Sequence, residues 1–417
     1  MIFMRILHTS DWHLGQNFFT KSRRNEHQKF IAWLLEQVQE NVINAVIIAG
    51  DVFDTGAPPS YAREMYNQFV VEMNKVNCEL IVLGGNHDSV STLNESKQLL
   101  AHLNARVIAN TNEDLSTQLL TLPNSDGTVG AILCAVPFIR PRDVVTSVAG
   151  SSGVEKQQAL GEAIKSHYHQ LYQKALELRE ELALDVPIIA TGHLTALGVK
   201  QSDSVRDIYI GTLDGFAADG FPPADYIALG HIHRPQLVAK SEHIRYSGSP
   251  IPLSFDELKS QKQVVMVEFD KDKVSHITPI NVPIFQEMKA LKGDLETIEQ
   301  ELAQFKECEE TTWLCIEVEV QDYLSDLQQR IQTLTQDLNV EVLQLRRARN
   351  RNEQTLAQEK TETLAELTPF DVFTKRIEQE IFETEKEQQR AERMTTKFKQ
   401  ILSEVEHKDT DPQEGDA

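Results

Sequence analysis

The sequence predicts an α/β fold in which helices cover the faces of a β-sheet. Short apolar runs at residues 5–9, 45–49 and 80–83 have the length and β-branched content of buried strands, and helix-period segments separate them. Two later runs, at 187–191 and 226–229, repeat this pattern. Each of the five runs leads within a few residues to a side chain that can bind a metal ion. Because the functional loops of such sheets follow the carboxyl ends of strands, we expect a site there.

The size and composition of the chain indicate a soluble protein of two or three domains. Its 417 residues exceed one ordinary core, and 41% are hydrophobic while 25% are charged. No run approaches the roughly 20 apolar residues of a membrane span, and residues 1–14 lack the pattern of a signal peptide. We therefore expect a cytoplasmic protein. The scattered cysteines lack metal-finger spacing, which indicates reduced thiols: Cys78, Cys134, Cys308 and Cys315.

The formal net charge of -22 argues against binding nucleic acid by bulk electrostatics, since phosphate contacts favour Lys and Arg. A protein of this charge that acts on nucleic acid needs metal ions or a local basic cluster to offset it. The most concentrated basic cluster faces either DNA phosphates or a partner, or it is a solvated helix or linker face. It consists of Arg346, Arg347, Arg349 and Arg351.

The first predicted strand, residues 5–9, leads into Asp11 and His13. Side chains alternate in an extended segment, so these two are predicted to point to the same side. An acid and a histidine placed in this way suit one metal ion. Asp-x-His pairs are also common by chance, so this pair alone does not identify a site.

The second and third strands lead to further polar side chains. A helix-period segment precedes the strand 45–49, which ends in Gly50-Asp51. Another helix is predicted over 60–74, and the third strand then leads into the loop 84–88, Gly-Gly-Asn-His-Asp. Asp51 and Asn86 therefore both follow the carboxyl ends of predicted strands.

The middle of the chain continues the α/β pattern. Residues 119–122 and 131–136 are predicted to pair as a hairpin, and 154–184 to form a helix. The strand 187–191 then ends in Gly192-His193, and the strand 226–229 ends in Gly-His-Ile-His at 230–233.

Two further regions follow. Alternating segments over 236–279 predict antiparallel strands that close the first domain. A second, small α/β unit is predicted from a helix at 295–305, a strand at 312–320, a helix at 324–334 and a strand at 340–345. We therefore predict a first domain over 1–280, a small domain over 281–345 and a C-terminal region over 346–417.

The C-terminal region is polar and strongly charged, and its acidic end over 409–417 is predicted to be disordered. Within it, apolar residues recur at spacings of three and four, which predicts amphipathic helices. Their apolar face would pack on a partner or back on the small domain. These residues are Phe370, Phe373, Ile377, Ile381, Met394, Phe398, Ile401, Leu402 and Val405.

The candidate metal ligands are oxygen and imidazole donors without thiolate, a set that suits Mn²⁺, Fe²⁺ or Zn²⁺. Seven are too many for one ion and right for two ions if Asp51 bridges them. Two-metal sites stabilise the attacking and leaving oxygens of a phosphoryl displacement, so the set predicts hydrolysis of a phosphate ester. The ligands are Asp11, His13, Asp51, Asn86, His193, His231 and His233. The isolated histidines His8, His102 and His243 are interpreted as structural.

Taken in order, these motifs resemble those of the binuclear metallophosphoesterases. The segments 8–15, 50–56, 230–236 and 246–252 further resemble the SbcD branch of that family, which contains nuclease components of double-strand-break repair complexes. The resemblance covers residues 4–279. It implies a β-sandwich flanked by helices, with a cap domain and C-terminal helices after it.

The resemblance also implies a role for each candidate residue. One ion would be held by Asp11, His13, Asp51 and His233, and the other by Asp51, Asn86, His193 and His231. His87 matches the family's histidine that is not a ligand and that stabilises the transition state or protonates the leaving oxygen. Asp54 would orient His87, because a carboxylate fixes the tautomer of an imidazole. A turn-forming acid is the alternative for Asp54.

Known members of this branch cut DNA with Mn²⁺, as 3'-5' double-strand exonucleases and as endonucleases on hairpins and single strands, in repair, replication and recombination. They work with SbcC, an ATPase with long coiled-coil arms. The resemblance therefore implies two Mn²⁺ ions, DNA as substrate and a heteromer with two copies of each component. It further implies that 281–345 positions DNA and that the C-terminal helices grip SbcC, and it leaves open a homodimer of the nuclease domain.

Two other classes of function remain open on the residues alone. A phosphodiesterase or phosphatase that acts on nucleotides or phosphoproteins uses the same metal motifs, although the extra C-terminal regions argue against a minimal small-molecule enzyme. A non-catalytic scaffold is disfavoured by the complete ligand set and by the presence of His87.

Overall fold

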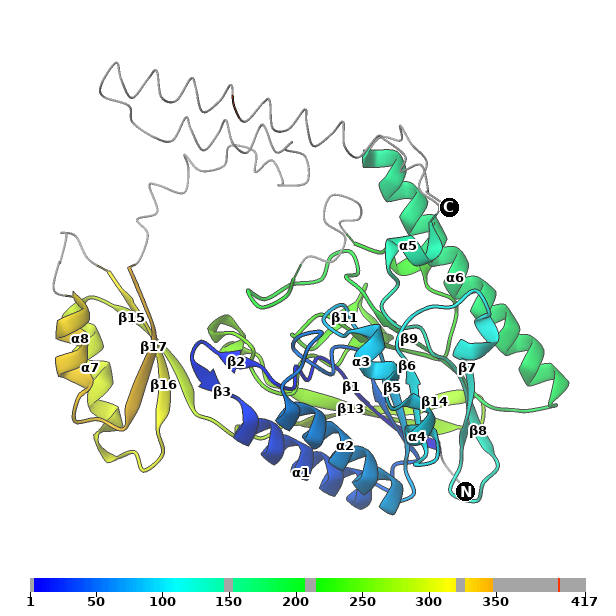
Figure 1. Ribbon diagram of the computed structural model, residues 1–417, viewed down its shortest axis with the longest axis horizontal. Helices are drawn as coiled ribbons and strands as arrows, with labels where there is room; N and C mark the ends of the chain where they lie inside the picture. The colour runs from blue at the N-terminus through cyan, green and yellow to red at the C-terminus, as the bar shows by residue number, and fades with distance from the viewer. Residues whose placement is uncertain (1–3, 146–152, 207–214, 320–326, 348–396, 398–417) are drawn as a thin grey trace, which may run out of the picture. The chain divides into compact units, whose positions relative to one another are not determined.

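The protein folds around a sandwich of two six-stranded sheets (Figure 1). The structure is a computed structural model that describes residues 4–145, 153–206, 215–319 and 327–347, together with Lys397. In order across the sheet, the first has β14 (Lys273–Asn281), β13 (Gln263–Asp270), β1 (Met4–Thr9), β4 (Ala45–Ile48), β5 (Glu79–Leu83) and β6 (Ala105–Ile108). The second has β11 (Gln236–Val238), β12 (Ser241–Tyr246), β10 (Tyr226–Gly230), β9 (Ile188–His193), β8 (Val129–Cys134) and β7 (Leu119–Pro123).

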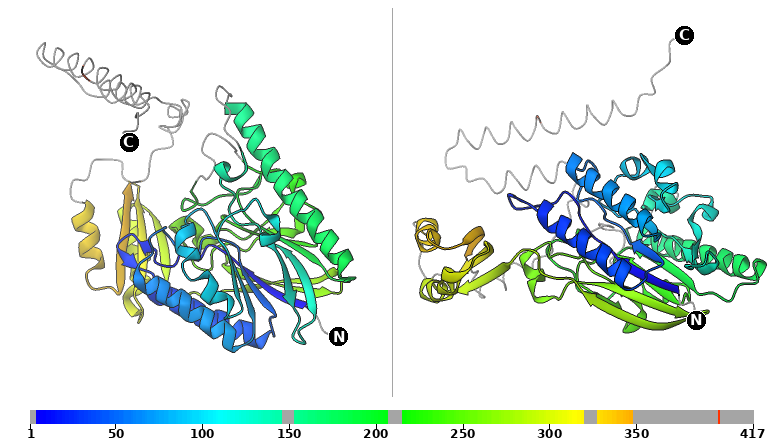
Figure 2. Two further views of the ribbon diagram at one scale, coloured as in Figure 1. Left: turned by 45° about the vertical axis from the view of Figure 1, so that its right-hand side comes forward. Right: turned by 90° about the horizontal axis from the view of Figure 1, so that it is seen from below.

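Helices cover the outer faces of both sheets. On the first sheet α1 (Arg24–Glu40) and α2 (Ser60–Lys75) lie side by side (Figure 2), and on the second sheet α6 (Gly153–Glu181) packs across β8 and β9. Three short helices complete this part: α3 (Val90–Asn94), α4 (Lys97–Ala101) and α5 (Pro141–Val144). No helix within the described ranges is long and apolar enough to cross a membrane.

Burial on both faces explains why β4 and β5 consist of nearly continuous apolar residues. In β4, Ile47 lies in the core between the two sheets, whereas Val46 lies under the helices of the outer face. The same alternation places Ile81 of β5 between the sheets and Leu80 under the helices. The predicted strands and the β7–β8 hairpin are confirmed, as are α2 and α6.

The carboxyl ends of the parallel strands of both sheets meet at one edge of the sandwich. Strands β1, β4, β5 and β6 are parallel in the first sheet, and β8, β9, β10 and β12 are parallel in the second. His193, at the end of β9, places its Nδ1 atom 2.8 Å from the carbonyl oxygen of Ala49, directly after β4. Loops from both sheets are therefore neighbours at this edge.

A third sheet builds the small domain, with β15 (Met288–Gly293), β16 (Thr312–Val318) and β17 (Val340–Arg347) all parallel. Its core packs against α7 (Leu295–Leu302) and α8 (Leu327–Thr335). The predicted helix, strand, helix, strand order is observed, and β15 is an additional strand. Arg346 and Arg347 lie at the exposed end of β17.

The small domain contacts the sandwich through a short hairpin, β2 (Asn17–Phe18) with β3 (Lys21–Ser22). The Phe18 ring stacks on Trp313 at 6.0 Å between centroids, and Lys21 Nζ lies 2.7 Å from Glu341 Oε1. The described residues up to Arg347 belong to one compact unit. The predicted C-terminal amphipathic helices, the acidic end, Arg349 and Arg351 lie outside the described residues.

Candidate metal centre

All seven predicted ligands lie at the edge where the carboxyl ends of the two sheets meet. Asp11 and His13 follow β1, Asp51 follows β4 and Asn86 follows β5. His193 ends β9, and His231 and His233 follow β10. Two sets of side chains place their possible ligand atoms within 4.8 Å of one another: Asp11, His13 and His233 in one, and Asp51, His193 and His231 in the other.

The Asp51 carboxylate lies between these two sets. Its Oδ2 atom is 3.2 Å from His193 Nε2 in one set and 3.7 Å from His13 Nε2 in the other. Its Oδ1 atom accepts a hydrogen bond of 2.8 Å from the backbone N–H of His87. One oxygen atom of Asp51 is thus shared by both halves of the site.

Asn86 belongs to the second set. Its Oδ1 atom lies 2.9 Å from His193 Nε2 and 3.2 Å from His231 Nδ1. The amide oxygen therefore faces the same space as the two imidazoles, as a metal ligand requires.

Hydrogen bonds at Nδ1 orient three of the imidazoles. Nδ1 of His193 contacts the Ala49 carbonyl oxygen, Nδ1 of His13 lies 3.2 Å from Asp54 Oδ1, and Nδ1 of His233 lies 2.6 Å from Ser204 Oγ. An acceptor at Nδ1 selects the tautomer in which Nε2 carries the free lone pair. Nε2 is then available to a metal ion.

The loops that carry the ligands adopt an uncommon backbone. Asp11, His13, Asp51 and His231 have φ values of +55°, +48°, +51° and +93°, in the left-handed region that costs on the order of 1 to 3 kcal/mol for a residue with a side chain. The prediction that Asp11 and His13 lie in an extended segment is therefore wrong. The segment turns because the backbone N–H groups of these two residues donate to the carbonyl oxygens of Gly50 and Asp51, each at 3.0 Å.

Glycine at position 85 allows the loop after β5 to approach the loop after β4. A Cβ atom at this position would lie 2.1 Å from Asp51 Oδ1. Any larger residue would therefore displace the Asp51 carboxylate. The Asp88 carboxylate joins the same two loops by accepting from the N–H groups of Val52, Phe53 and Gly85 at 2.9 to 3.2 Å.

Several buried polar atoms of the site have no hydrogen-bond partner. They are His13 Nε2, Asp51 Oδ2 and His231 Nε2. A buried polar atom without a partner costs free energy, and three that converge on one space are compensated if a cation occupies that space. The donor set of carboxylate, amide oxygen and imidazole fits first-row divalent ions.

The electrostatic character of the site agrees with this fit. Burial alone lowers the pKa of His193, but the Asp51 and Asp11 carboxylates raise it to about 9. Burial also lowers the pKa of His13, and the Asp54, Asp51 and Asp11 carboxylates raise it above its usual value. The acidic groups therefore favour positive charge in the interior of the site.

The predicted catalytic residues have different partners from those expected. His87 Nδ1 lies 2.7 Å from the backbone carbonyl oxygen of Asp54, whereas the Asp54 carboxylate contacts His13. The prediction that the Asp54 carboxylate orients His87 is wrong. Asp54 directly follows the β-bridge between Leu14 and Phe53, and there its side chain lies beside His13 while its backbone oxygen faces His87.

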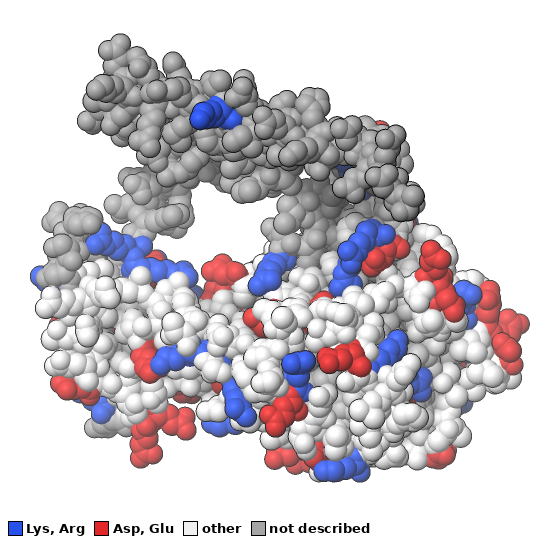
Figure 3. All heavy atoms as spheres, in the orientation of Figure 1, with Lys and Arg blue, Asp and Glu red and all other residues white. Residues whose placement is uncertain are grey.

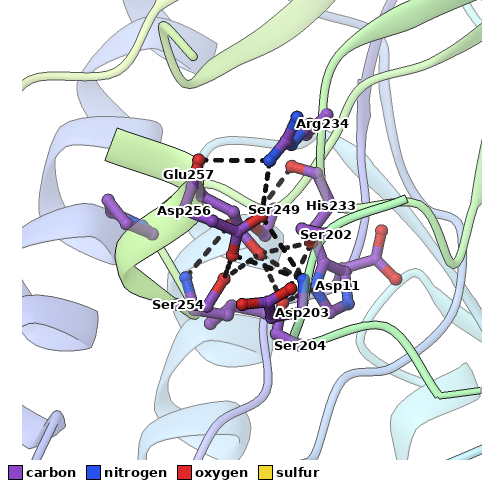
Figure 4. Close-up of polar contacts among 12 residues, drawn as sticks. Asp11, Ser202, Asp203, Ser204, His233, Arg234, Ser249, Ser254, Asp256 and Glu257 are labelled. Atoms are coloured by element: carbon purple, nitrogen blue, oxygen red, sulfur yellow. Dashed lines mark hydrogen bonds and ion pairs between the residues drawn. The ribbon is translucent and has the colours of Figure 1, made fainter. Parts of the chain in front are cut away.

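Glu257 is a buried residue of the site that sequence reasoning missed. Its Oε1 atom lies 3.3 Å from His233 Nδ1 (Figure 4). Its Oε2 atom accepts a hydrogen bond of 2.5 Å from Lys262 Nζ. Because its partners come from separate segments, no local sequence pattern marks it. Arg140 was also missed: its Nη2 atom donates to the carbonyl oxygen of Asp88 at 3.3 Å.

The histidines interpreted as structural lie outside the centre. His8 is buried between Tyr226 Oη at 3.0 Å and the Leu229 carbonyl oxygen at 3.1 Å. Burial lowers the pKa of His8 to about 3, so its imidazole is neutral. His102 and His243 are exposed.

Comparisons with known proteins cover both domains. The calcineurin-like phosphoesterase family matches residues 4–235, and the family described as type 5 capsule protein repressor C-terminal domain matches residues 284–380. The chain is 52% identical over 405 residues to the SbcD component of the SbcCD nuclease of Escherichia coli strain K12, which covers 97% of this chain and 100% of that protein. The SbcD proteins of Rhodobacter capsulatus and Bacillus subtilis are each 31% identical, covering 67% and 64% of this chain and 70% and 66% of those proteins. A solved dimetal phosphatase from Danio rerio is a more distant match, with 12% identity and a TM-score of 0.34. The match covers 67% of this chain and 99% of that protein.

Proposed function

The chain belongs to the SbcD family of nucleases within the calcineurin-like phosphoesterases, and we propose that it cuts DNA with two bound Mn²⁺ ions. The proposed reactions are 3'-5' exonuclease action on double strands and endonuclease action on hairpins and single strands. They serve the processing of DNA ends in repair, replication and recombination.

The observation that carries the proposal is the convergence of unpartnered buried atoms from both sheets around Asp51. We assign Asp11, His13, Asp51 and His233 to one ion and Asp51, Asn86, His193 and His231 to the other. When bound, two such ions supply Lewis-acid charge that activates water and stabilises the oxygens of a phosphate in displacement.

The remaining roles belong to residues of this chain. His87 holds its Nδ1 proton against the Asp54 carbonyl oxygen, so the proton that it donates to the phosphate or to the leaving oxygen is the Nε2 proton of its imidazolium form. The Asp54 carboxylate orients His13, whereas the contact of Asp54 with His87 is made by its backbone carbonyl oxygen. Asp88 keeps the Asp51 and Asn86 loops together through its three N–H contacts.

We further propose SbcC as the partner, in a heteromer with two copies of each protein. The support is the 52% identity to a protein named as the SbcD component of SbcCD, along essentially all of both chains. The residues proposed to contact SbcC, including Phe373 and Ile377, lie outside the described residues.

Cleavage of defined DNA substrates tests the proposal. The purified full chain, loaded with Mn²⁺, Mg²⁺ or Zn²⁺, is given blunt duplex, hairpin and single-stranded DNA, with and without SbcC and ATP. Mn²⁺-dependent cleavage of all three substrates is expected, with blunt duplex degraded from its 3' ends. Turnover of nucleotides or phosphoproteins by a Mn²⁺-loaded chain that leaves every DNA intact would contradict the proposal and favour the phosphatase alternative.

A further inference from the structure

The loop that follows β9 is fixed to the metal centre by two serines (Figure 4). Ser202 Oγ donates to Glu257 Oε1 at 2.7 Å, and Ser204 Oγ contacts the same oxygen. Ser204 Oγ also lies 2.6 Å from Nδ1 of His233, a proposed metal ligand. Both hydroxyls therefore point into the protein toward one buried carboxylate.

The Glu257 carboxylate that receives these serines is itself well anchored. It is fully buried, and Lys262 Nζ balances its charge at 2.5 Å while the Leu253 N–H donates at 3.0 Å. Hydrogen bonds to a buried charged group are stronger than those between neutral groups. The contacts with Ser202 and Ser204 therefore hold the loop in one position.

A second set of contacts fixes Lys200 and Asp203 of the same loop. The Lys200 N–H donates to Gln236 Oε1 at 2.9 Å, and Gln236 Nε2 donates to the Lys200 carbonyl oxygen at 2.8 Å. The Asp203 N–H donates to the Asp256 carboxylate at 3.3 Å. A surface loop with this many contacts is preorganised and loses little conformational entropy when it binds a ligand.

Arg206 lies two residues beyond Ser204, whose hydroxyl contacts the proposed ligand His233. Its side chain is exposed, and none of the hydrogen bonds or ion pairs among the described residues involves its guanidinium. Two residues of extended chain span at most about 7 Å, so Arg206 lies close to the metal centre with its guanidinium available to a ligand.

We propose that Arg206 is a substrate-binding residue on the loop that follows β9. It binds a phosphate of the DNA strand next to the phosphate that is cleaved. The inference rests on the proposed DNA nuclease function and adds a contact outside the metal centre. A guanidinium pairs with phosphate in a planar, bidentate way, and a free one beside a phosphodiesterase centre suits the next phosphate along a chain. Blue and red side chains are interspersed on the face drawn in Figure 3. Because the net charge is -22, individual contacts of this kind matter more than bulk electrostatic attraction.

Two substrates separate this role from a role in the metal centre. One is a DNA hairpin, which carries many phosphates, and the other is bis(p-nitrophenyl) phosphate, a diester with a single phosphate. Arg206→Ala is expected to raise the KM for DNA by about tenfold with little change in kcat, since it removes binding that is equal in the ground and transition states. Metal content and turnover of the single-phosphate ester are expected to stay within about twofold of wild type.

Matched variants complete the experiment. Arg206→Lys should recover part of the loss. Lys273→Ala removes one exposed positive charge at the start of β14, opposite Asp270 of β13, and should leave all readouts unchanged. The slope of log(1/KM) against log salt should become shallower by about one unit in Arg206→Ala only.

Two results would overturn the inference. One is a KM for DNA in Arg206→Ala that rises no more than in Lys273→Ala. The other is an equal loss on DNA and on the single-phosphate ester, which would place Arg206 at the cleaved phosphate or at the metals. Failure of the wild type to cut DNA while it still hydrolyses the small ester would instead reject the proposed function.

Discussion

Nε2 of His193 lies 3.2 Å from Oδ2 of Asp51, and this contact joins the end of one sheet to the loop after a strand of the other. Because Asp51 also approaches His13, the loss of its charge affects both halves of the site. Asp51→Asn should therefore retain fewer than two tightly bound ions, and DNA cleavage should fall by at least about a hundredfold, since bound metals supply several kcal/mol of charge stabilisation. Elemental analysis after dialysis measures the ions, with the exposed Asp337→Asn as control. Two ions retained at wild-type affinity would exclude Asp51 as the shared ligand.

His87→Ala tests a residue that lies beside the centre without being a proposed ligand. Both ions should remain, and cleavage should fall by about a hundredfold or more, because a positioned acid or oxyanion partner contributes that much. Nuclease rates and metal content are measured on the same preparation, with the exposed His243→Ala as control. Loss of the metals, or unchanged cleavage, would show that the assigned role is wrong.

Glu257→Gln tests whether a buried carboxylate supports His233. The amide keeps the shape of the side chain but removes the charge opposite Nδ1 of His233, 3.3 Å away. Metal affinity should fall by about tenfold to a hundredfold, as for other partners of ligating histidines. Isothermal titration with Mn²⁺ measures this fall, and the exposed Glu242→Gln variant serves as control. The melting temperature of the metal-free protein is also recorded, because Lys262 loses its counter-charge. An unchanged affinity would mean that His233 is oriented by Ser204 alone.

Acid stability should depend on His8, which lies outside the proposed ligand set. Burial lowers the pKa of His8 to about 3 in the folded protein, below the ordinary value of 6.5. Between these two values the unfolded chain binds one more proton than the folded chain, so the free energy of unfolding falls as pH decreases from 6.5. Between pH 7 and 5 the free energy of unfolding should therefore fall less in His8→Gln than in wild type. Below pH 6.5 the two slopes should differ by up to about 1.4 kcal/mol per pH unit. Urea unfolding of both metal-free proteins at several pH values gives the slopes, and equal slopes would contradict a neutral buried His8.

Removal of the C-terminal region tests the partner assignment. A chain that ends at Asn350 should keep Mn²⁺-dependent cleavage of simple DNA ends and should lose SbcC in a pull-down, along with ATP-stimulated activity. Charged substitutions at Phe373, Ile377 and Phe398 should have the same effect without lowering the melting temperature of the core. Undiminished SbcC binding would reject the assignment, and a large drop in core stability would mean that these residues pack on the small domain.

The sequence predicted those parts of the fold that depend on local periodicity. Strands β4 and β5 are buried on both faces, so their apolar runs stand out, and glycines or acids follow them directly. Strand β15 was missed because Met288–Gly293 is half exposed and contains two lysines. The β2–β3 hairpin was missed because two-residue strands leave no periodic pattern.

The sequence predicted which side chains come together at this edge, but it did not predict their contacts. The positions of Asp11, Asp51 and Asn86 follow from the shared edge of parallel strands. The partner of the Asp54 carboxylate depends on the path of the backbone between two loops, which spacing does not determine. Glu257 depends on contacts between distant segments, which the order of residues alone does not reveal.

The pairing of β1 with β13 has a consequence for the synthesis of the protein. Arg5 of β1 contacts Glu268 of β13 across 263 positions of the chain, with Nε 2.8 Å from Oε1. A ribosome needs on the order of tens of seconds to add that many residues. Until then one side of β1 has no strand to pair with, and unpaired strand edges promote aggregation. The nascent chain is therefore expected to need shielding by a chaperone before β13 leaves the ribosome.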